Sequence, residues 1–400
     1  MVLADLKKIK DKTNLHKTRI SDNGIFWIAV LIVIALSHYY LYCVVGVHLN
    51  GWLEASWLFV GAVAILSSAA VRRLGLPKRK IGNVSFQSAI HRFGASWNIF
   101  VFFVSLFMVL LRYFAAFSVE ASFWIACGIA FCLSAYGIYE ARTVRTVKIE
   151  MLTTKKVSPS GRLRIAQLTD LHIGPFMNLK HVARVVDKLL AARPDMIVIT
   201  GDLVDGAVGD AEGVSPFYVP FAAELARLAG AAPALGVWAV PGNHDHYEGF
   251  GDTRAFIEMS HISLLLSETR DLGDIVVIGA DDQDHIRASS DNARFSRSEQ
   301  LVHALSAEER AKFTLLLRHR PIVESSTLGM FDLQLSGHTH GGQLFSHPSS
   351  RHKIPGCCKG LMHLRNGSFL YVSNGAGFVG PPMRFLAPAE IVVIDLLSID

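Results

Sequence analysis

The chain has 400 residues, of which 51% are hydrophobic, and it carries a formal net charge of +5 at pH 7. Of its five cysteines, Cys43, Cys127 and Cys132 lie in long apolar runs and Cys357 and Cys358 are adjacent, so the sequence shows neither a disulfide framework nor a CxxC zinc pattern. The length leaves room for two or three domains. The apolar residues are unevenly distributed, because nearly all of the long apolar runs lie before residue 142.

Four of these runs predict membrane-spanning helices, at residues 24–47, 52–71, 97–117 and 121–139. The first is longer than the roughly 20 residues that a helix needs to cross a bilayer. No small-residue cleavage site of a signal peptide follows it. The only charged residues inside the runs are Glu54 and Arg112. A buried core helix is the alternative for any single run, but four in succession predict a transmembrane bundle.

Lysines and arginines gather at alternate connections between the predicted spans. They precede the first span, fill the connection between the second and third, and follow the fourth: Lys7, Lys8, Lys10, Lys12, Lys17, Arg19, Arg72, Arg73, Lys78, Arg79, Lys80, Arg92, Arg142, Arg145 and Lys148. Solvated loops would explain each cluster but not their alternation. Because basic residues near span ends stay on the cytoplasmic side, we expect a multi-pass inner-membrane protein. Its termini, and everything after residue 142, would lie in the cytosol.

Beyond the fourth run the pattern changes to short β-branched and apolar runs separated by Gly, Asp, Asn and Pro. Strands are predicted at residues 163–168, 196–200, 237–240, 275–278, 313–317, 333–335, 369–372 and 391–394. Between the first two, Asn178 can cap a helix that ends before Pro194. Strands alternating with helices favour a layered α/β domain. The predicted organisation is a membrane domain at 1–141, a linker at 142–161 and an α/β domain at 162–400.

Polar residues follow five of the predicted strands directly. The stretches TDLHIG, TGDLVDG and PGNHDHYEG follow the first three, RHRP follows the fifth and SGHTHGGQ follows the sixth. Open α/β sheets usually bind ligands outside the carboxyl ends of their strands. We therefore expect these loops to bring together ten acidic, amide and imidazole side chains: Asp170, His172, Asp202, Asp205, Asn243, His244, Asp245, His319, His338 and His340.

Seven of these residues offer oxygen or nitrogen ligands without a thiolate: Asp170, His172, Asp202, Asn243, His319, His338 and His340. His338 and His340 lie in an extended segment, where alternate side chains point the same way, and the surrounding glycines let backbone and metal approach closely. Such ligands suit two divalent ions, manganese first and otherwise iron, zinc or nickel. A lone histidine would favour a hydrogen-bonded structural role, but the ordered series DxH, GDxxD, GNHD, His and GHxH is specific.

This series resembles the motifs of the calcineurin-like metallophosphoesterase superfamily, over residues 160–400. The resemblance implies a four-layer αββα sandwich, here preceded by the bundle of four transmembrane helices. It also implies two ions, one held by Asp170, His172 and His340, the other by Asn243, His319 and His338, with Asp202 as the bridge. Two ions about 3.5 to 4 Å apart can share an attacking hydroxide and stabilise charge on the entering and leaving oxygens.

His244 follows the ligand Asn243 directly, so it is expected to face the phosphate rather than the same metal. The resemblance implies that His244 protonates the leaving group or stabilises the transition state, with Asp245 as its orienting partner. Asp205 is expected to fix its loop or to make a hydrogen bond behind the metal ligands.

The stretches GDLVDG, GHTHGGQ and GPPMRFLAPAEI look most like the bacterial membrane-attached phosphodiesterase branch of the superfamily. That branch includes enzymes similar to UDP-2,3-diacylglucosamine pyrophosphatase. Two features depart from its pattern, RHRP in place of SHNP and His246 in place of a tyrosine. Neither departure removes a metal ligand, so both bear on substrate specificity.

The implied activity is hydrolysis of a phosphodiester or pyrophosphate bond in a lipid-linked substrate. Residues 346–366 mix cations with apolar residues after the last metal motif, which suits a lipid headgroup, the membrane surface or an ordinary loop. Residues 281–312 are expected to form a solvated helix pair. The alternatives are a soluble nucleotide-type substrate and a non-catalytic membrane sensor, and the intact ligand set argues against the sensor. The expected partners are the phosphate-ester substrate and the bilayer, with no nucleic acid and no obligate protein partner.

Overall fold

The computed structural model describes residues 22–45, 84–115, 117–174, 176–205, 208–210, 213–247, 249–282, 296–344 and 359–399. The chain divides into two compact units. The first unit contains Met1–Gly82 and Phe93–Cys132, and the second contains Asn83–Arg92 and Leu133–Asp400.

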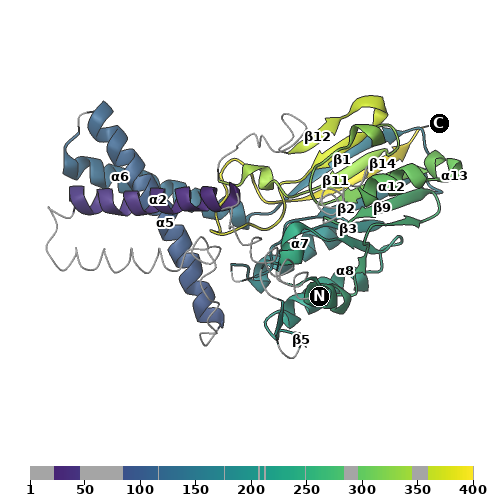
Figure 1. Ribbon diagram of the computed structural model, residues 1–400, viewed down its shortest axis with the longest axis horizontal. Helices are drawn as coiled ribbons and strands as arrows, with labels where there is room; N and C mark the ends of the chain where they lie inside the picture. Colours follow the sequence, from purple (N-terminus) through teal and green to yellow (C-terminus); the bar gives the residue numbers. More distant parts are fainter. Residues whose placement is uncertain are drawn as a thin grey trace, which may run out of the picture. The chain divides into compact units, whose positions relative to one another are not determined.

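Three long helices precede the sheets: α2 (Asp22–Val45), α5 (Val84–Phe114) and α6 (Val119–Arg142) (Figure 1). Within the described residues, two segments are long and apolar enough to cross a membrane, Arg92–Phe114 and Val119–Arg142. The apolar segment of α2, Val30–Val44, is shorter than these two. The predicted span at 52–71 lies outside the described residues. The described part of the chain therefore contains two candidate spans, not the predicted bundle of four.

Two six-stranded mixed sheets form the centre of the second unit. The first has the order β1-β14-β2-β3-β6-β7. Its strands are β1 (Arg145–Thr153), β14 (Glu390–Ser398), β2 (Arg162–Leu168), β3 (Met196–Thr200), β6 (Val237–Val240) and β7 (Ser263–Leu264). The second has the order β12-β13-β11-β10-β9-β8. Its strands are β12 (Gly360–His363), β13 (Phe369–Val372), β11 (Leu333–Ser336), β10 (Phe313–Arg318), β9 (Ile275–Ala280) and β8 (Glu268–Asp271).

All eight predicted strands are confirmed, and the two sheets pack face to face. β3 contacts β10 and β6 contacts β9, and Val198, Val277 and Leu315 are buried together between the sheets. Because successive side chains of a strand point to opposite faces, Val276 and Ile278 lie on the outer face of the second sheet. Strands buried on both faces are apolar throughout rather than alternating, which is why these strands could be recognised in the sequence.

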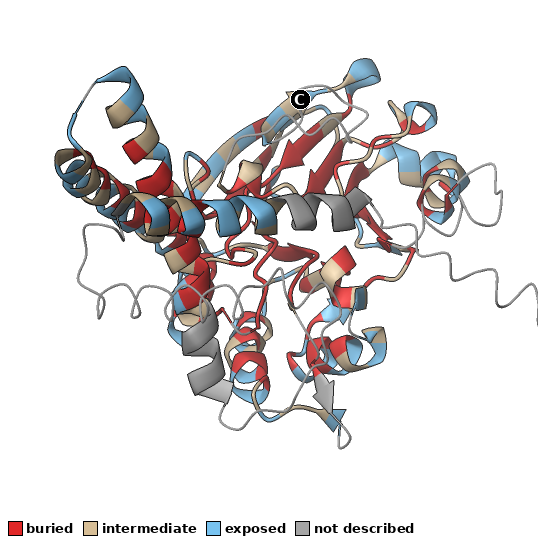
Figure 2. Ribbon diagram, turned by 60° about the vertical axis from the view of Figure 1, so that its left-hand side comes forward, coloured by how far each residue is buried: buried red, intermediate tan, exposed pale blue. Residues whose placement is uncertain are grey.

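Helices cover the outer faces of the sheets. α7 (Leu179–Ala191) packs against β14 and α8 (Val219–Gly230). Its predicted cap is confirmed, since Asn178 Oδ1 accepts a hydrogen bond of 2.8 Å from His181 N. α12 (Arg297–Ala304) lies on the second sheet, where Val302 joins the outer apolar cluster. The four layers αββα are therefore present, with the most buried residues in the strands (Figure 2).

The prediction of a linker at 142–161 is wrong for residues 145–153. Residues Arg145–Thr153 form β1, which pairs in parallel with β14 along all nine of its residues. The exposed and buried residues of β1 alternate in part, because this strand lies at the edge of the sheet and faces solvent on one side. The α/β domain thus begins directly after α6.

The parallel strands determine where the loops meet. β2, β3 and β6 are parallel to one another in the first sheet, and β9, β10, β11 and β13 are parallel in the second. The carboxyl ends of these strands therefore lie along one edge of each sheet. The motif-bearing loops follow at this edge.

Candidate functional site

The loops after β2 and β3 are hydrogen bonded side by side beyond the ends of their strands. Asp170 N donates to Gly201 O (3.0 Å) and His172 N donates to Asp202 O (3.0 Å). These bonds continue the pairing of the two strands for a few more residues. As a result, the side chains of the DLH and GDLVD motifs lie next to one another.

Five predicted ligands have the left-handed backbone conformation: Asp170 (φ 52°), His172 (φ 51°), Asp202 (φ 52°), His338 (φ 72°) and His340 (φ 53°). The prediction that His338 and His340 lie in an extended segment is wrong, because both have a positive φ and His340 begins the short 3-10 helix η4 (His340–Gly342). The left-handed conformation is uncommon for residues with a Cβ atom and costs about 1–3 kcal/mol at each position. It persists only where the surrounding structure holds it. Here the hydrogen-bonded loops do so, and such positions cluster at functional sites.

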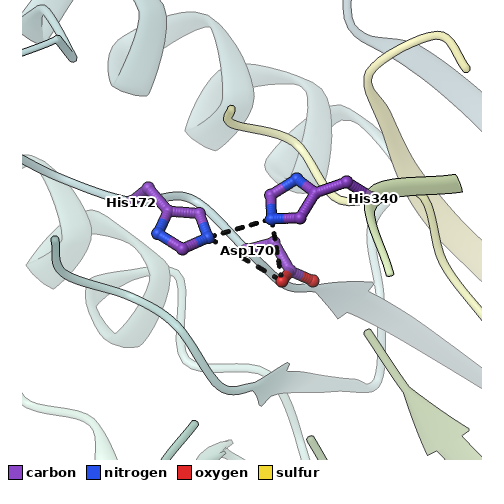
Figure 3. Close-up of side chains that lie close together, drawn as sticks. All are labelled: Asp170, His172 and His340. Carbon is purple, nitrogen blue, oxygen red and sulfur yellow. Dashed lines mark hydrogen bonds and ion pairs between the residues drawn. The ribbon is translucent and has the colours of Figure 1, made fainter. Parts of the chain in front are cut away.

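Asp170, His172 and His340 form the first ligand group (Figure 3). His172 Nε2 lies 3.0 Å from His340 Nε2, and Asp170 Oδ1 lies 3.4 Å from His340 Nε2 and 3.9 Å from His172 Nε2. All three side chains are buried. Three ligand atoms from two sheets therefore point at one small volume, as the resemblance implies for one ion.

Asp202, His319 and His338 form the second ligand group. Asp202 Oδ2 lies 3.1 Å from His319 Nε2, and His338 Nδ1 lies 3.2 Å from the same nitrogen. His319 Nδ1 donates to Thr200 O (2.8 Å), because a carbonyl oxygen only accepts. Asp202 Oδ2 is also 3.6 Å from His172 Nε2 in the first group. Asp202 is thus in position to bridge two ions.

Asn243 supplies an oxygen to the same edge. Its Nδ2 donates to Tyr247 Oη (3.0 Å), and its buried Oδ1 has no hydrogen-bond partner among the described residues. A buried amide oxygen without a partner is costly unless it binds something else. With the two ligand groups, this oxygen completes a donor set that fits two divalent cations.

Glycines allow the motif loops to approach one another. A Cβ atom on Gly337, which precedes His338, would collide with Asp170 Oδ2 and Thr169 Oγ1. A Cβ atom on Gly242, which precedes Asn243, would collide with the Asp202 side chain. Gly337 and Gly242 are therefore required by packing around the predicted ligands.

Burial determines the charge of the first ligand group. Desolvation lowers the pKa of His172 to about 4 and, with His172 and Arg384, lowers the pKa of His340 well below its usual range. Both imidazoles are therefore neutral at pH 7, which is the form that binds metals. Burial also raises the pKa of Asp170 to about 6, so its carboxylate is still largely ionised at pH 7.

Asp202 and His319 are buried together and shift each other's pKa in opposite directions. Burial alone would raise the pKa of Asp202, but His319 holds it well below its usual range. Burial alone would lower the pKa of His319, but Asp202 raises it to about 10. The Asp202 carboxylate is therefore ionised, as a ligand shared by two cations must be.

Comparison with known proteins identifies the family. The family described as "Calcineurin-like phosphoesterase" matches residues 163–342. An "Uncharacterized metallophosphoesterase" of Aquifex aeolicus is 32% identical over 270 residues, which cover 67% of this chain and 97% of that protein. The chain belongs to the calcineurin-like metallophosphoesterases. It is therefore a metal-dependent phosphoesterase.

Two further relatives are longer than the shared region. An "Uncharacterized metallophosphoesterase" of Helicobacter pylori is 32% identical over 271 residues, which cover 65% of this chain and 66% of that protein. A "Transmembrane protein with metallophosphoesterase domain" of Danio rerio is 28% identical over 284 residues, which cover 66% of this chain and 60% of that protein. The similarity therefore covers about two thirds of this metallophosphoesterase.

His244 of this metallophosphoesterase lies beside the first ligand group. Its ring meets the His172 ring edge to face, with centroids 4.8 Å apart, and its backbone N donates to Asp202 Oδ1 (2.8 Å). Asp205 Oδ1 lies 2.9 Å from His244 Nδ1. A carboxylate only accepts when ionised, so Asp205 holds a proton on Nδ1 and fixes the ring orientation.

The predicted orienting role of Asp245 is wrong, because Asp205 fills it. Asp245 instead accepts hydrogen bonds from three backbone N–H groups, those of Leu203 (3.0 Å), Val204 (3.1 Å) and Gly242 (2.8 Å). It ties the loop after β3 to the loop after β6. Sequence adjacency was misleading, since neighbouring residues of the one-turn helix α9 (Asn243–Tyr247) do not face each other.

The two departures from the family pattern lie on the His319 side of the site. His246 Nε2 is 2.7 Å from Asp281 Oδ1, and Arg320 pairs with the buried Asp282 at 2.9 Å. The described part of 281–312 forms α12 and α13 (Ala307–Ala311), in agreement with the expected helix pair. Of the segment 346–366, residues up to 358 lie outside the described residues, and the rest contains β12.

Proposed function

We propose that this metallophosphoesterase is anchored in a membrane and hydrolyses a phosphodiester or pyrophosphate bond in a lipid-linked substrate. One observation carries the proposal. α6 ends at Arg142 and β1 begins at Arg145, so only Thr143 and Val144 separate a candidate span from the sheet. A domain tethered this closely meets membrane lipids at high effective concentration. The zebrafish relative, named a transmembrane protein, supports the same assignment.

The chain's own residues define how the reaction would proceed. Two divalent ions, held by the two ligand groups with Asn243 and Asp202, would orient the phosphate and offset charge on its oxygens. Asp205 holds the proton on His244 Nδ1. The protonated His244 ring can then donate from Nε2 to the leaving oxygen, which is general acid catalysis. The His244–Asp205 pair is the reason to prefer an enzyme over a ligand-binding sensor.

Manganese is the metal we propose first, because carboxylate and amide oxygens suit it, and iron, zinc or nickel would suit the imidazoles of the same donor set. We also propose that the active site faces the cytosol. Arg142 ends the candidate span α6, and Arg145 and Lys148 follow it. Basic residues near span ends stay on the cytoplasmic side. Reporter domains fused after residue 160 should report from the cytosol, and activity of a periplasm-restricted reporter would overturn the orientation.

The substrate is tested with purified, detergent-solubilised, manganese-loaded protein. Phosphorus NMR would follow the appearance of new phosphomonoesters from a membrane lipid extract and, in parallel, from a set of nucleotides. Asp202→Ala serves as the inactive control. Products from the lipid extract alone support the proposal. Products from nucleotides alone would replace the lipid-linked substrate by a soluble one, with the spans as a tether.

A further inference from the structure

Arg384 is a fully buried arginine beside the first ligand group. Its guanidinium donates to the carbonyl oxygens of Gly377 (2.9 Å from Nε), Asn374 (2.8 Å from Nη2), Gly375 (3.2 Å from Nη2) and Ala387 (3.0 Å from Nη1). Burial lowers the pKa of Arg384 to about 10, so the group stays cationic at pH 7. A buried charge is retained only where such hydrogen bonds replace water.

The segment that accepts these bonds supports Asp170. Gly377 N donates to Asp170 O (2.9 Å) and Ala376 N donates to Thr169 O (3.0 Å). A Cβ atom on Gly375 would lie 2.6 Å from Asp170 Cβ. The segment 374–377 therefore contacts Asp170 through Gly375 and Gly377, and Arg384 fixes the carbonyl groups of Asn374, Gly375 and Gly377.

Arg384 also contacts His340 on the side away from the other ligands. Its Nη2 lies 3.3 Å from His340 Nδ1 and its Nη1 lies 3.4 Å from His340 O. The opposite ring nitrogen, Nε2, faces Asp170 and His172 (Figure 3). A guanidinium only donates and a ring that binds an ion through Nε2 carries its proton on Nδ1, so the contact with His340 O is the one that remains when an ion is bound. One guanidinium therefore fixes the backbone at His340 and the segment behind Asp170.

The residues around Arg384 contact the last turns of α6. Arg384 N donates to Gly137 O (2.9 Å) and Phe385 N donates to Gln343 O (2.7 Å). The Phe385 ring lies against Gly137, where a Cβ atom would be 2.7 Å from Cζ of the ring. It also meets the Tyr136 ring, with centroids 6.2 Å apart. Any side chain larger than hydrogen at Gly137 would displace Phe385 or the helix.

We propose that Arg384 is a positioning residue for the ion at the first ligand group, and that α6 holds it in place through the Gly137–Phe385 contact. A shift of this end of α6 would move Phe385 and the adjacent Arg384, and with them His340 relative to Asp170. A candidate membrane span would thus be coupled mechanically to one of the two ions. The inference rests on the proposed role of His340 as a metal ligand and is independent of the lipid substrate.

The test uses two glycines of α6 as a matched pair. Alanine is a better helix former than glycine at either position. A Cβ atom on Gly128 would have no heavy atom within 4 Å, whereas one on Gly137 meets Phe385. We expect Gly128→Ala to bind manganese like the unaltered protein. Gly137→Ala should bind one of the two manganese ions about tenfold more weakly. This is the lower limit of the roughly 10- to 100-fold loss of metal affinity that follows when a group supporting a metal ligand is altered.

Electron paramagnetic resonance of the full-length protein titrated with manganese alone distinguishes one bound ion from a coupled pair. In Gly137→Ala the coupled signal should appear only at higher manganese, after a signal from a single ion. Phe385→Ala removes the contact altogether and should weaken the same ion, as Gly137→Ala does. Arg384→Lys, which keeps the charge but loses the planar fork, should weaken the same ion by about 10- to 100-fold.

The possible results distinguish a wrong assignment of the metal ligands from a wrong assignment of the coupling through α6. If the unaltered protein never binds two manganese ions, the ligand assignment itself is wrong. If it binds two and Gly137→Ala does so with unchanged affinity, the coupling through α6 is overturned. If Arg384→Lys weakens both ions equally in parallel with a lower melting temperature, Arg384 is a general structural residue and positions neither ligand.

Discussion

The two edges of the sheets in the second unit are stabilised in different ways. At the carboxyl ends of the strands, buried polar groups converge and the ligand residues have left-handed backbones. At the amino ends, partly exposed ion pairs join the strands, such as Arg164–Asp395 (2.8 Å) and Lys155–Asp332 (2.8 Å). At the first edge, the predicted metal ligands have unfavourable backbone conformations and buried charges. At the second edge, the ion pairs contribute to the stability of the fold. Substitutions at the two edges should therefore affect different quantities.

The largest expected effect at the ligand edge comes from Asp202→Ala. Asp202 Oδ2 lies within reach of His319 (3.1 Å) and His172 (3.6 Å), so its loss should weaken both ions and abolish turnover. Metal content by elemental analysis and activity on an aryl phosphodiester measure the effect. Asp187→Ala, at an exposed position of α7, is the control and should keep both. Two tightly held ions per chain in Asp202→Ala would contradict the bridging assignment.

His244→Ala should separate catalysis from metal binding at the same edge. The predicted metal ligands are all retained, so both ions should remain bound. General acid catalysis typically contributes about 10² to 10⁴ in rate, so the loss should be severe for a poor alkoxide leaving group. It should be much smaller for p-nitrophenolate, which leaves without a proton. Equal losses on both substrates, or an emptied metal site, would make His244 a phosphate clamp or a ligand.

Substitutions of Asp205 and Asp245, the two aspartates near His244, should have smaller effects, and each should change a different property. Asp205→Asn should lower turnover by roughly 10- to 100-fold with normal stability, because the ring loses its charged partner. Asp245→Asn should mainly lower the free energy of unfolding, because three backbone N–H groups lose a charged acceptor. Thermal unfolding and kcat measured on both variants decide between them. The reverse pattern would restore the role that the sequence predicts for Asp245.

The smallest effect is expected at the amino-end edge, from Asp395→Asn. Hydrogen bonds from Arg164, and then from Arg162, lower the pKa of Asp395 in the folded protein. The stabilisation is therefore present above the unfolded pKa of about 3.9 and is lost as the pH falls through the lower folded value. At pH 7 the variant should lose about 1 kcal/mol or less, with unchanged activity. The difference in melting temperature from the unaltered protein should shrink in acid, and a constant difference would argue against the ion pair.

The sequence predicts the parts of this molecule that depend on local pattern. β3 and β10 are apolar throughout because both of their faces are covered. The ends of these apolar runs can be located in the sequence, and with them the predicted metal ligands Asp202 and His319 that follow. β1 could not, since it is half exposed and its partner β14 is distant in sequence. The same reason hides Arg384, whose role depends on contacts with residues from α6 and from the loop after β11. The pairing of His244 with Asp205 could not be predicted either, because it depends on how the loops after β3 and β6 lie in the fold and not on the sequence separation of the two residues.

The position of β14 has a consequence for how the protein is made. β14 leaves the ribosome after every other described strand, yet it lies between β1 and β2. Until it arrives, β1 and β2 each present an unpaired edge that can bind another chain. Pairing between segments so distant in sequence is also slow. A nascent chain halted before Glu390 should therefore be an aggregation-prone open sheet, and a substrate for quality-control proteases rather than a smaller enzyme.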